Sequence, residues 1–197
     1  MSRRSAVGVT LIELMIAVVV IGVLLTLAAP SLYDFILMQR LKGTQAQLVT
    51  DLQFARSSAA SGGLDVQVVF APATDESALS CYTLYTDTSS NPRHKCDCRQ
   101  APGSRCLQPT TQELRTVQIP TRSGVRLALP SLQAKGLGFL ATTGAIRIWP
   151  VDWLAPSPEF MVEASVDADR KLRTWIGLSG RPTVCAPSGA VIGYAAC

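Results

Sequence analysis

The chain has 197 residues and a formal net charge of +4, which is too small to argue by itself for a nucleic-acid-binding protein. It contains one His, and neither a nucleophile paired with a general base nor a glycine-rich phosphate loop is visible in its sequence. We therefore expect no enzymatic activity, no catalytic residue, no cofactor and no bound metal. Apolar residues concentrate near the N-terminus, so the remainder has the composition of an ordinary soluble domain.

A basic start and a long apolar run open the chain. Arg3 and Arg4 come first, and from residue 14 to residue 38 the only charged residue is Asp34. A bilayer-spanning helix needs roughly 20 apolar residues, so the run predicts a transmembrane helix over about residues 9–38. The positive-inside rule keeps the two arginines in the cytoplasm. Most of the chain then lies on the other side of the membrane.

Glu13 does not fit an ordinary membrane segment, where a carboxylate costs roughly 2.5–3.5 kcal/mol and usually has a function and a partner. A secretory signal peptide would explain the basic start and the small residues Ala28 and Ala29. However, Glu13 interrupts its apolar middle, and Pro30 is an awkward residue to find just after a cut. A plain single-pass anchor explains the apolar run but neither Glu13 nor the boundary at Gly8.

Residues 8–14 read Gly-Val-Thr-Leu-Ile-Glu-Leu and lead into the apolar run. This sequence resembles the class III signal of type IV pilins and type II secretion pseudopilins. In that family, prepilin peptidase cuts a short basic leader after its Gly, the new N-terminus is methylated, and a Glu stands fifth. The resemblance implies a leader of residues 1–8, cleavage between Gly8 and Val9, and N-methylation of Val9. Val9 stands where the family usually has Phe.

The chemistry of Glu13 agrees with this resemblance. Cleavage after Gly8 creates a free amine on Val9, and an amine and a carboxylate neutralise each other inside lipid. In a filament the amine of a neighbouring subunit is available to Glu13. We therefore expect Glu13 to act as a register device through which the chain joins other major and minor pilins.

The apolar half of the predicted helix is interrupted by Gly22 and Pro30. Pro30 has no N–H and crowds the preceding turn. Such a residue is either a tolerated kink in a membrane helix or an assembly device that lets residues 22–30 unwind when the subunit leaves the bilayer. Related filaments show such melting.

Beyond the bilayer the helix is predicted to continue over residues 39–61 as an amphipathic segment. Its apolar residues recur at spacings of 7, 4, 3 and 4, which places them on one face of a helix. They are Leu41, Leu48, Leu52, Ala55 and Ala59. Gly62-Gly63 supplies the stop. This face is expected to pack on a sheet, so that one helix over residues 9–61 connects the membrane with a head.

The periodicity changes from 3.6 to 2 after Gly63, which indicates strands. We expect an α+β fold in which the helix packs on an antiparallel, two-sheet β head of residues 62–197, without a second helix. The expected strands are residues 65–71, 79–86, 114–119, 125–129, 138–141, 145–149, 160–164 and 172–178.

The head resembles the branch that contains FimT, FimU and general secretion pathway protein H. The shared features are Gly138-Phe139, Thr143-Gly144 and Gly180-Arg181 with a Cys nearby. The resemblance implies a minor pilin of a type IV pilus that primes or caps assembly, at the tip and beside a tip adhesin. It implies a bacterial inner-membrane protein with a periplasmic head that later enters the pilus. The alternative is an H-type pseudopilin of type II secretion.

Six cysteines in an exported domain indicate disulfide bonds, because the bacterial periplasm is oxidising. Cys185 and Cys197 bracket a short C-terminal segment, and pilins commonly carry a C-terminal disulfide loop, so we expect this pair. Closing a loop of this size stabilises the fold by roughly 3 kcal/mol in the chain-entropy model.

Residues 87–113 form a Cys-rich stretch that is long for a loop without structure of its own. Its sequence His-Lys-Cys-Asp-Cys at residues 94–98 departs from the Cys-x₂₋₄-Cys spacing of structural zinc sites, so we expect disulfides rather than a metal. A bridge between Cys96 and Cys98 is sterically disfavoured, and each should reach elsewhere. The pairing stays open among Cys81, Cys96, Cys98 and Cys106.

Some FimT proteins bind DNA through a C-terminal Gly-Arg-x-Arg motif, and residues 180–183 here read Gly-Arg-Pro-Thr. Arg181 matches the first arginine, whereas Thr183 replaces the second and removes a phosphate contact. Seven other cations are available to replace it: Arg170, Lys171, Arg173, Arg93, Lys95, Arg99 and Arg105. The ordinary alternative is a solvated turn with scattered charges. Double-stranded DNA is therefore a further candidate partner, with Arg181 as the first residue to test.

Overall fold

The computed structural model describes residues 10–74, 77–88, 96–130, 135–149 and 159–197. Its chain divides into two compact units, Met1–Ile36 and Leu37–Cys197, and we call the second unit the head. A single helix, α1 (Leu11–Gly62), contributes to both units. The leader and the predicted cleavage site between Gly8 and Val9 lie outside the described residues.

The first unit is the apolar start of α1, whose large apolar side chains over residues 11–25 and 32–36 are exposed in the single chain. Among the described residues, no single helix is long and apolar enough to span a membrane. Two segments of α1, Leu11–Thr26 and Ser31–Gly62, are bent relative to each other, and only taken together do they reach the length and apolar content that a membrane span requires. The four residues between these segments end with Pro30, which lacks the N–H needed for a regular helical hydrogen bond.

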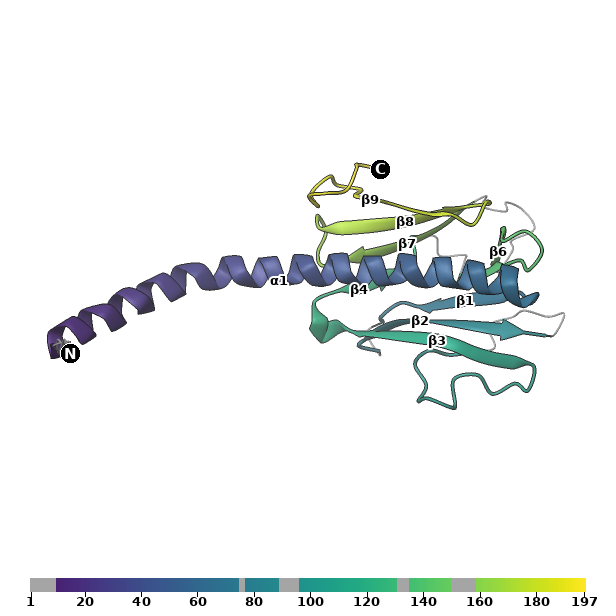
Figure 1. Cartoon of the computed structure of the whole chain (residues 1–197), viewed down its shortest axis with the longest axis horizontal. Coiled ribbons are helices and arrows are strands. Elements are labelled where there is room, and N and C mark those ends of the chain that lie inside the picture. Colours follow the sequence, from purple (N-terminus) through teal and green to yellow (C-terminus); the bar gives the residue numbers. More distant parts are fainter. Residues whose placement is uncertain (1–9, 75–76, 89–95, 131–134, 150–158) are drawn as a thin grey trace, which may run out of the picture. The chain divides into compact units, whose positions relative to one another are not determined.

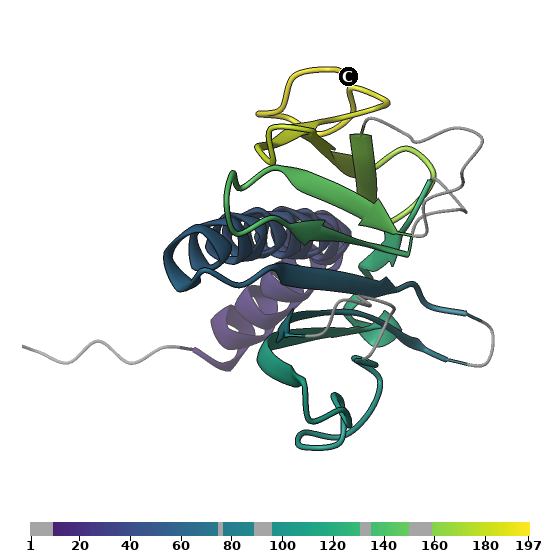
Figure 2. The ribbon, with the colours of Figure 1, turned by 90° about the vertical axis from the view of Figure 1, so that its right-hand side faces the viewer.

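In the described residues of the head, nine antiparallel strands form two sheets. The five-stranded sheet has the order β3-β2-β1-β5-β6, and the four-stranded sheet has the order β4-β7-β8-β9. Figure 1 shows β1–β3 on one side of the second half of α1 and β7–β9 on the other, and Figure 2 shows the same arrangement along the helix. The strands are β1 (Val66–Ala71), β2 (Leu79–Asp87), β3 (Thr111–Pro120), β4 (Arg126–Ala128), β5 (Gly136–Phe139), β6 (Ile146–Trp149), β7 (Glu159–Ser165), β8 (Lys171–Gly177) and β9 (Pro182–Cys185).

The α+β fold with a long N-terminal helix and two antiparallel sheets confirms the expectation from sequence. The predicted apolar face of α1 forms the centre of the core, where it meets Val68, Leu84, Phe139 and Phe160 from the sheets. Its members are fully buried: Leu41, Leu48, Leu52, Ala55 and Ala59. Burial of one large aliphatic side chain contributes about 1.5–3 kcal/mol, so this face fixes the helix on the head.

The strand prediction was wrong in two places. It missed β9, which is short and begins with Pro182; proline is tolerated there because β9 is the edge of its sheet and Pro182 needs no ladder N–H on its outer side. It also set the Cys-rich loop at residues 87–113, whereas β2 continues to Asp87 and β3 begins at Thr111. A short 3₁₀ helix, η1 (Thr121–Ser123), follows β3.

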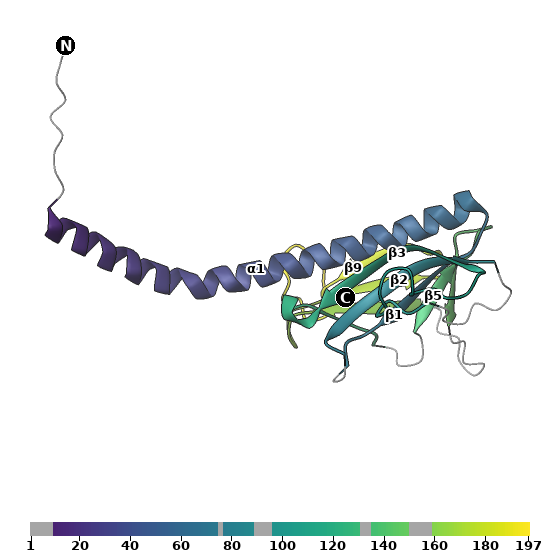
Figure 3. The same ribbon diagram turned by 90° about the horizontal axis from the view of Figure 1, so that it is seen from below.

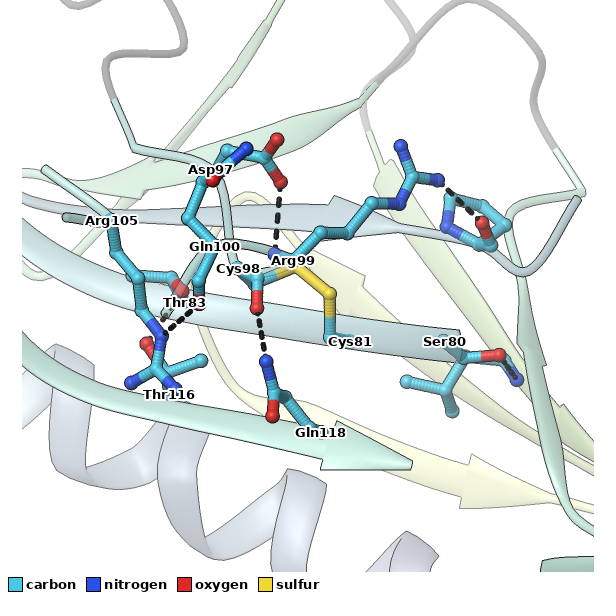
Figure 4. The surroundings of a disulfide bond; sticks show 12 residues. Ser80, Cys81, Thr83, Asp97, Cys98, Arg99, Gln100, Arg105, Thr116 and Gln118 are labelled. Carbon is cyan, nitrogen blue, oxygen red and sulfur yellow. Dashed lines mark hydrogen bonds between the residues drawn. A yellow bond between two sulfur atoms is a disulfide. The ribbon is translucent and has the colours of Figure 1, made fainter. Parts of the chain in front are cut away.

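Disulfides attach the Cys-rich loop to the five-stranded sheet. Cys98 bonds to Cys81 on β2, and Cys96 bonds to Cys106 within the loop. The Gln118 side chain of β3 also donates a hydrogen bond to the Cys98 carbonyl at 2.7 Å, as Figure 4 shows. The loop therefore lies over the outer face of β2 and β3, and the open question of its pairing is resolved.

A buried carboxylate links α1 to the five-stranded sheet. The Asp51 side chain is fully buried and accepts a hydrogen bond from the Tyr82 hydroxyl at 2.7 Å. It also pairs with the Arg115 guanidinium, whose side chain is 46% exposed and lies over the Phe54 ring. Burial and the bond to Asp51 raise the pKa of Tyr82, and the same carboxylate raises the pKa of Arg115.

We predict that Asp51→Ala lowers the free energy of unfolding by about 1–3 kcal/mol, because it leaves the buried Tyr82 hydroxyl without its acceptor. Arg115→Ala leaves the fully buried Asp51 carboxylate without its cation and should lower it by more, about 3–5 kcal/mol. Urea unfolding of the full chain in detergent micelles, followed by tryptophan fluorescence, measures both. Equal effects of the two variants would contradict this assignment.

Candidate functional site

The first candidate site is the start of α1, where Thr10 caps the helix. The Glu13 backbone N–H donates to the Thr10 hydroxyl at 3.3 Å, and the Leu14 N–H donates to the Thr10 carbonyl at 3.1 Å. Thr10 followed by Glu13 three residues later is the spacing of a capping box. This local geometry begins the helix directly behind the predicted cleavage site.

Glu13 projects from the first turn of the helix and is exposed. Within the described part of this chain, its carboxylate has no hydrogen bond or ion pair, and the apolar side chains around it are exposed as well: Leu11, Ile12, Leu14, Met15 and Ile16. A negative charge is favourable in the first turn of a helix, but in lipid it still requires a positive partner. The geometry leaves Glu13 available to a group outside this set of residues.

The second candidate site is a groove of about 480 Å³ between the last turns of α1 and the loops beside them. Two arginines line it together with Thr143 and Gly144: Arg56 lies on α1, and Arg181 directly precedes β9. The Arg56 Nε donates to the Gly144 carbonyl at 3.2 Å, whereas Arg181 is exposed and has no polar partner in the described residues. The groove thus offers one fixed and one free guanidinium.

Gly180 allows the loops to approach this closely. It adopts a φ of +74°, and a Cβ at this position would lie 2.3 Å from the Gly144 carbonyl oxygen. A Cβ on Gly144 would lie 3.2 Å from the Arg56 Nε, a tight contact with a side chain rather than with backbone. The Gly180-Arg181 pair noted in the sequence is therefore the element that closes one wall of the groove.

Most of the other cations proposed for DNA are occupied. Arg170 pairs with Asp167 at 2.6 Å, Arg173 with Glu163 at 2.6 Å, and Arg105 with Glu113 at 2.8 Å. The Arg99 guanidinium donates to the Pro72 carbonyl at 2.9 Å. Lys171 is half-buried at the start of β8, and Arg93 and Lys95 lie outside the described residues.

The ion pairs also lower the pKa values of the carboxylates in them. Backbone and side-chain hydrogen bonds from Arg170 lower the pKa of Asp167. Burial raises the pKa of Glu113, but hydrogen bonds from Thr116 and Arg105 outweigh it and lower the pKa overall. These carboxylates stay ionised at neutral pH and keep Arg170 and Arg105 engaged.

The structure therefore brings together Arg181 and Arg56 but not Arg181 and the β7–β8 cations. Sequence reasoning missed Arg56, because it considered only the apolar face of the amphipathic segment over residues 39–61. The available signal was the helical spacing of Gln53, Arg56, Ser57 and Ala60, which form a stripe beside the apolar face and line the groove. The expected Cys185–Cys197 disulfide is present and closes the loop after β9.

Comparison with known proteins identifies a family at the N-terminus. Residues 4–29 match the family described as "Prokaryotic N-terminal methylation motif", which confirms the motif recognised in the sequence. No curated protein matches the chain. Similar solved structures include two crystal forms of the type IV minor pilin FimU of Pseudomonas aeruginosa, at 15% and 16% identity and a TM-score of 0.47. The similarity covers 79% and 78% of this chain and 95% and 98% of those chains.

We predict that Gly180→Ala lowers the free energy of unfolding more than Gly189→Ala, which serves as the matched control. Both residues have positive φ, but a Cβ on Gly189 meets nothing within 4 Å. The free energy of unfolding of the control should fall by about 1–2 kcal/mol, from backbone strain alone. That of Gly180→Ala should fall by about 1–3 kcal/mol more, because the added Cβ overpacks the contact. Thermal or urea unfolding measures the difference, and equal losses would refute the close approach as the reason for Gly180.

Proposed function

We propose that the chain is a minor pilin of a type IV pilus, of the FimT/FimU kind. The observation that carries this proposal is the match of residues 4–29 to the methylation motif. Within this motif Glu13 is exposed and has no partner among the described residues. The protein is held in the bacterial inner membrane by the apolar start of α1, with its head in the periplasm. It then leaves the bilayer and joins other major and minor pilins in the filament.

Processing precedes assembly in this proposal. Prepilin peptidase cuts between Gly8 and Val9 and removes the basic leader with Arg3 and Arg4. The new amine of Val9 is methylated and remains a cation. It is the partner that a Glu13 carboxylate of a neighbouring subunit needs, because an isolated carboxylate is costly in an apolar environment. Docking with a neighbour then offsets the cost of Glu13, and a subunit in the wrong register gains nothing.

The place in the filament follows from the FimT/FimU resemblance. We propose that the subunit primes or caps assembly at the tip, beside a tip adhesin. Residues 27–30, including Pro30, separate the two segments of the bent helix and are where α1 would unwind on leaving the bilayer. An H-type pseudopilin of type II secretion would share all these features. Cross-linking in cells that carry both systems separates them by whether pilins or pseudopilins are recovered.

We predict that Glu13→Ala is cleaved and methylated normally but reaches sheared filaments at least tenfold less than the unaltered chain. The expected loss reflects the carboxylate's cost of roughly 2.5–3.5 kcal/mol in lipid, which only the unaltered chain relieves on assembly. Quantitative immunoblots of filament and membrane fractions measure the ratio. Asp34→Ala is the matched control, since it removes the other carboxylate of the apolar run. Normal incorporation of Glu13→Ala would sink the register role.

A second function, binding of double-stranded DNA by the head, is favoured by the groove between Arg56 and Arg181. Phosphate contacts dominate the affinity of such binding and make it depend on salt. Arg181 is exposed and free of carboxylates in the described residues, and Arg56 lines the same groove. Two cations are few, so we expect weak binding that serves uptake or surface contact rather than sequence recognition.

We predict that Arg181→Gln weakens DNA binding and lowers the slope of log affinity against log salt by about 0.9, the value for one phosphate contact. Arg170→Gln removes an equal charge that is already paired with Asp167 and should leave the slope unchanged. Fluorescence anisotropy with a short duplex and the full chain in neutral detergent measures both slopes. Binding that is absent, or equally reduced in both variants, would exclude a DNA site in this groove.

A further inference from the structure

The loop after β9 holds an isoleucine outward at one end of the head. Ile192 is 86% exposed, more than any other large apolar side chain in the described residues. Its neighbour Val191 is buried, and the Lys42 ammonium donates to the Ile192 carbonyl at 2.9 Å. The Cys185–Cys197 disulfide closes the loop. Ile192 is therefore fixed in its exposed position and does not belong to a frayed terminus.

Lys42 identifies this end as the one that α1 reaches first, and we call it the proximal end of the head. The loop after β9 and strand β4 both lie there in Figure 1, and Figure 3 shows the same loop there from below. No charged side chain occurs from residue 182 to residue 197. The exposed residues around Ile192 are therefore uncharged in their side chains and mostly small, such as Gly189, Ala190 and Gly193.

Four cations lie at the same end of the head as this loop. Arg40 and Lys42 project from α1, and Arg122 and Arg126 flank the turn after η1. The Arg40 guanidinium donates to the Ser123 carbonyl at 3.0 Å, which ties η1 to the helix. In the described structure none of these four cations has a carboxylate partner.

The nearby carboxylates do not neutralise this set. The β7–β8 turn lies beside the loop, since the Ser188 hydroxyl donates to the Asp169 carbonyl. Of its two acids, Asp167 is already paired with Arg170. Asp169 remains, so the proximal end has an excess of positive charge around an apolar tip.

Chain continuity brings this end close to the expected bilayer. The apolar run ends at about residue 38, and Arg40 and Lys42 follow it within the same helix. At 1.5 Å per residue, Lys42 lies about 6 Å along the helix beyond that point. This distance holds whatever direction the apolar segment takes.

We propose that the proximal end of the head is a lipid-binding surface that docks on the anionic phospholipid headgroups of the leaflet from which the head emerges. Ile192 enters the headgroup region, while Arg40, Lys42, Arg122 and Arg126 contact the phosphates. An apolar side chain with basic neighbours is the combination that binds anionic interfaces. The inference rests on the proposed function, because it requires α1 to be anchored in the membrane.

Docking of this kind orients the head before assembly. A subunit in the bilayer would be held with its proximal end covered. The groove lined by Arg56 and Arg181, which we call the distal groove, would stay free. Extraction into a filament would then break the lipid contacts of four cations and one isoleucine. Each cation near an anionic surface strengthens binding roughly fivefold, so the headgroup composition should set how firmly the head is held.

Hydrogen exchange of the full chain in nanodiscs tests this surface. Discs of phosphatidylglycerol are compared with discs of phosphatidylcholine, and the peptides that contain residues 121–124 and 186–196 are followed by mass spectrometry. We expect at least fivefold slower exchange of both segments in the anionic discs. Equal exchange in the two kinds of disc would overturn the inference.

Substitutions in the proposed surface, measured by the same hydrogen-exchange comparison, test which side chains contribute to docking. Arg122→Gln with Arg126→Gln should lower the docking equilibrium about 25-fold, at roughly fivefold per cation, and so remove the protection. Ile192→Ser should weaken it as well. The matched controls are Arg181→Gln, which removes a cation beside the distal groove, and Leu107→Ser, which removes an 80% exposed apolar residue from the loop before β3. Equal effects of controls and test variants would also overturn the inference.

Co-migration of the chain with the discs in size exclusion separates this inference from the proposed function. A chain that leaves the discs lacks the membrane anchor, which refutes the anchored function and the docking together. A chain that stays in the discs but shows equal exchange in both lipids refutes the docking alone. Unchanged exchange of the buried β7 and β8 amides verifies that each variant is folded.

Discussion

A carboxylate inside an apolar helix needs a positive partner, and this constraint governs the apolar N-terminal segment of the molecule. Glu13 stands in the first turn of α1 among exposed apolar side chains and has no partner in the described part of its own chain. The cost of such a group in lipid makes the isolated subunit an incomplete structure. A partner from a second subunit, created by removal of the leader, would complete it, which is why processing and assembly are linked in this account.

The same helix carries a second carboxylate that is satisfied within the chain. Asp51 is as fully buried as any core residue, but Tyr82 and Arg115 hold it on the five-stranded sheet. The two halves of α1 therefore differ in where their acids find partners. The head closes its own network and folds around the helix, whereas the apolar half leaves Glu13 open for a neighbour. In the proposed function, one continuous element serves both as the core of a domain and as a connector between subunits.

Sequence periodicity predicted the parts of the fold that depend on one buried face. Leu41 to Ala59 recur at helical spacing because a single face of α1 meets the sheets, and alternation marked the strands for the same reason. β9 was missed because an edge strand beginning with Pro182 shows no such pattern. The groove was only half predicted: Gly180-Arg181 carries a local signal, but Arg56 joins it through tertiary packing. Disulfide pairing in the Cys-rich loop likewise depends on where Cys81 lies in the sheet.

Intact mass and N-terminal sequencing of the protein from its native membrane tests the central claim most directly. The account predicts a mature chain that begins with N-methylated Val9 and lacks residues 1–8. That result would establish the amine that Glu13 requires of a neighbouring subunit. A chain that begins at Met1 or after Ala28 would contradict the account, because no new amine would then stand four residues before Glu13 and the apolar helix would be an ordinary anchor or a removed signal.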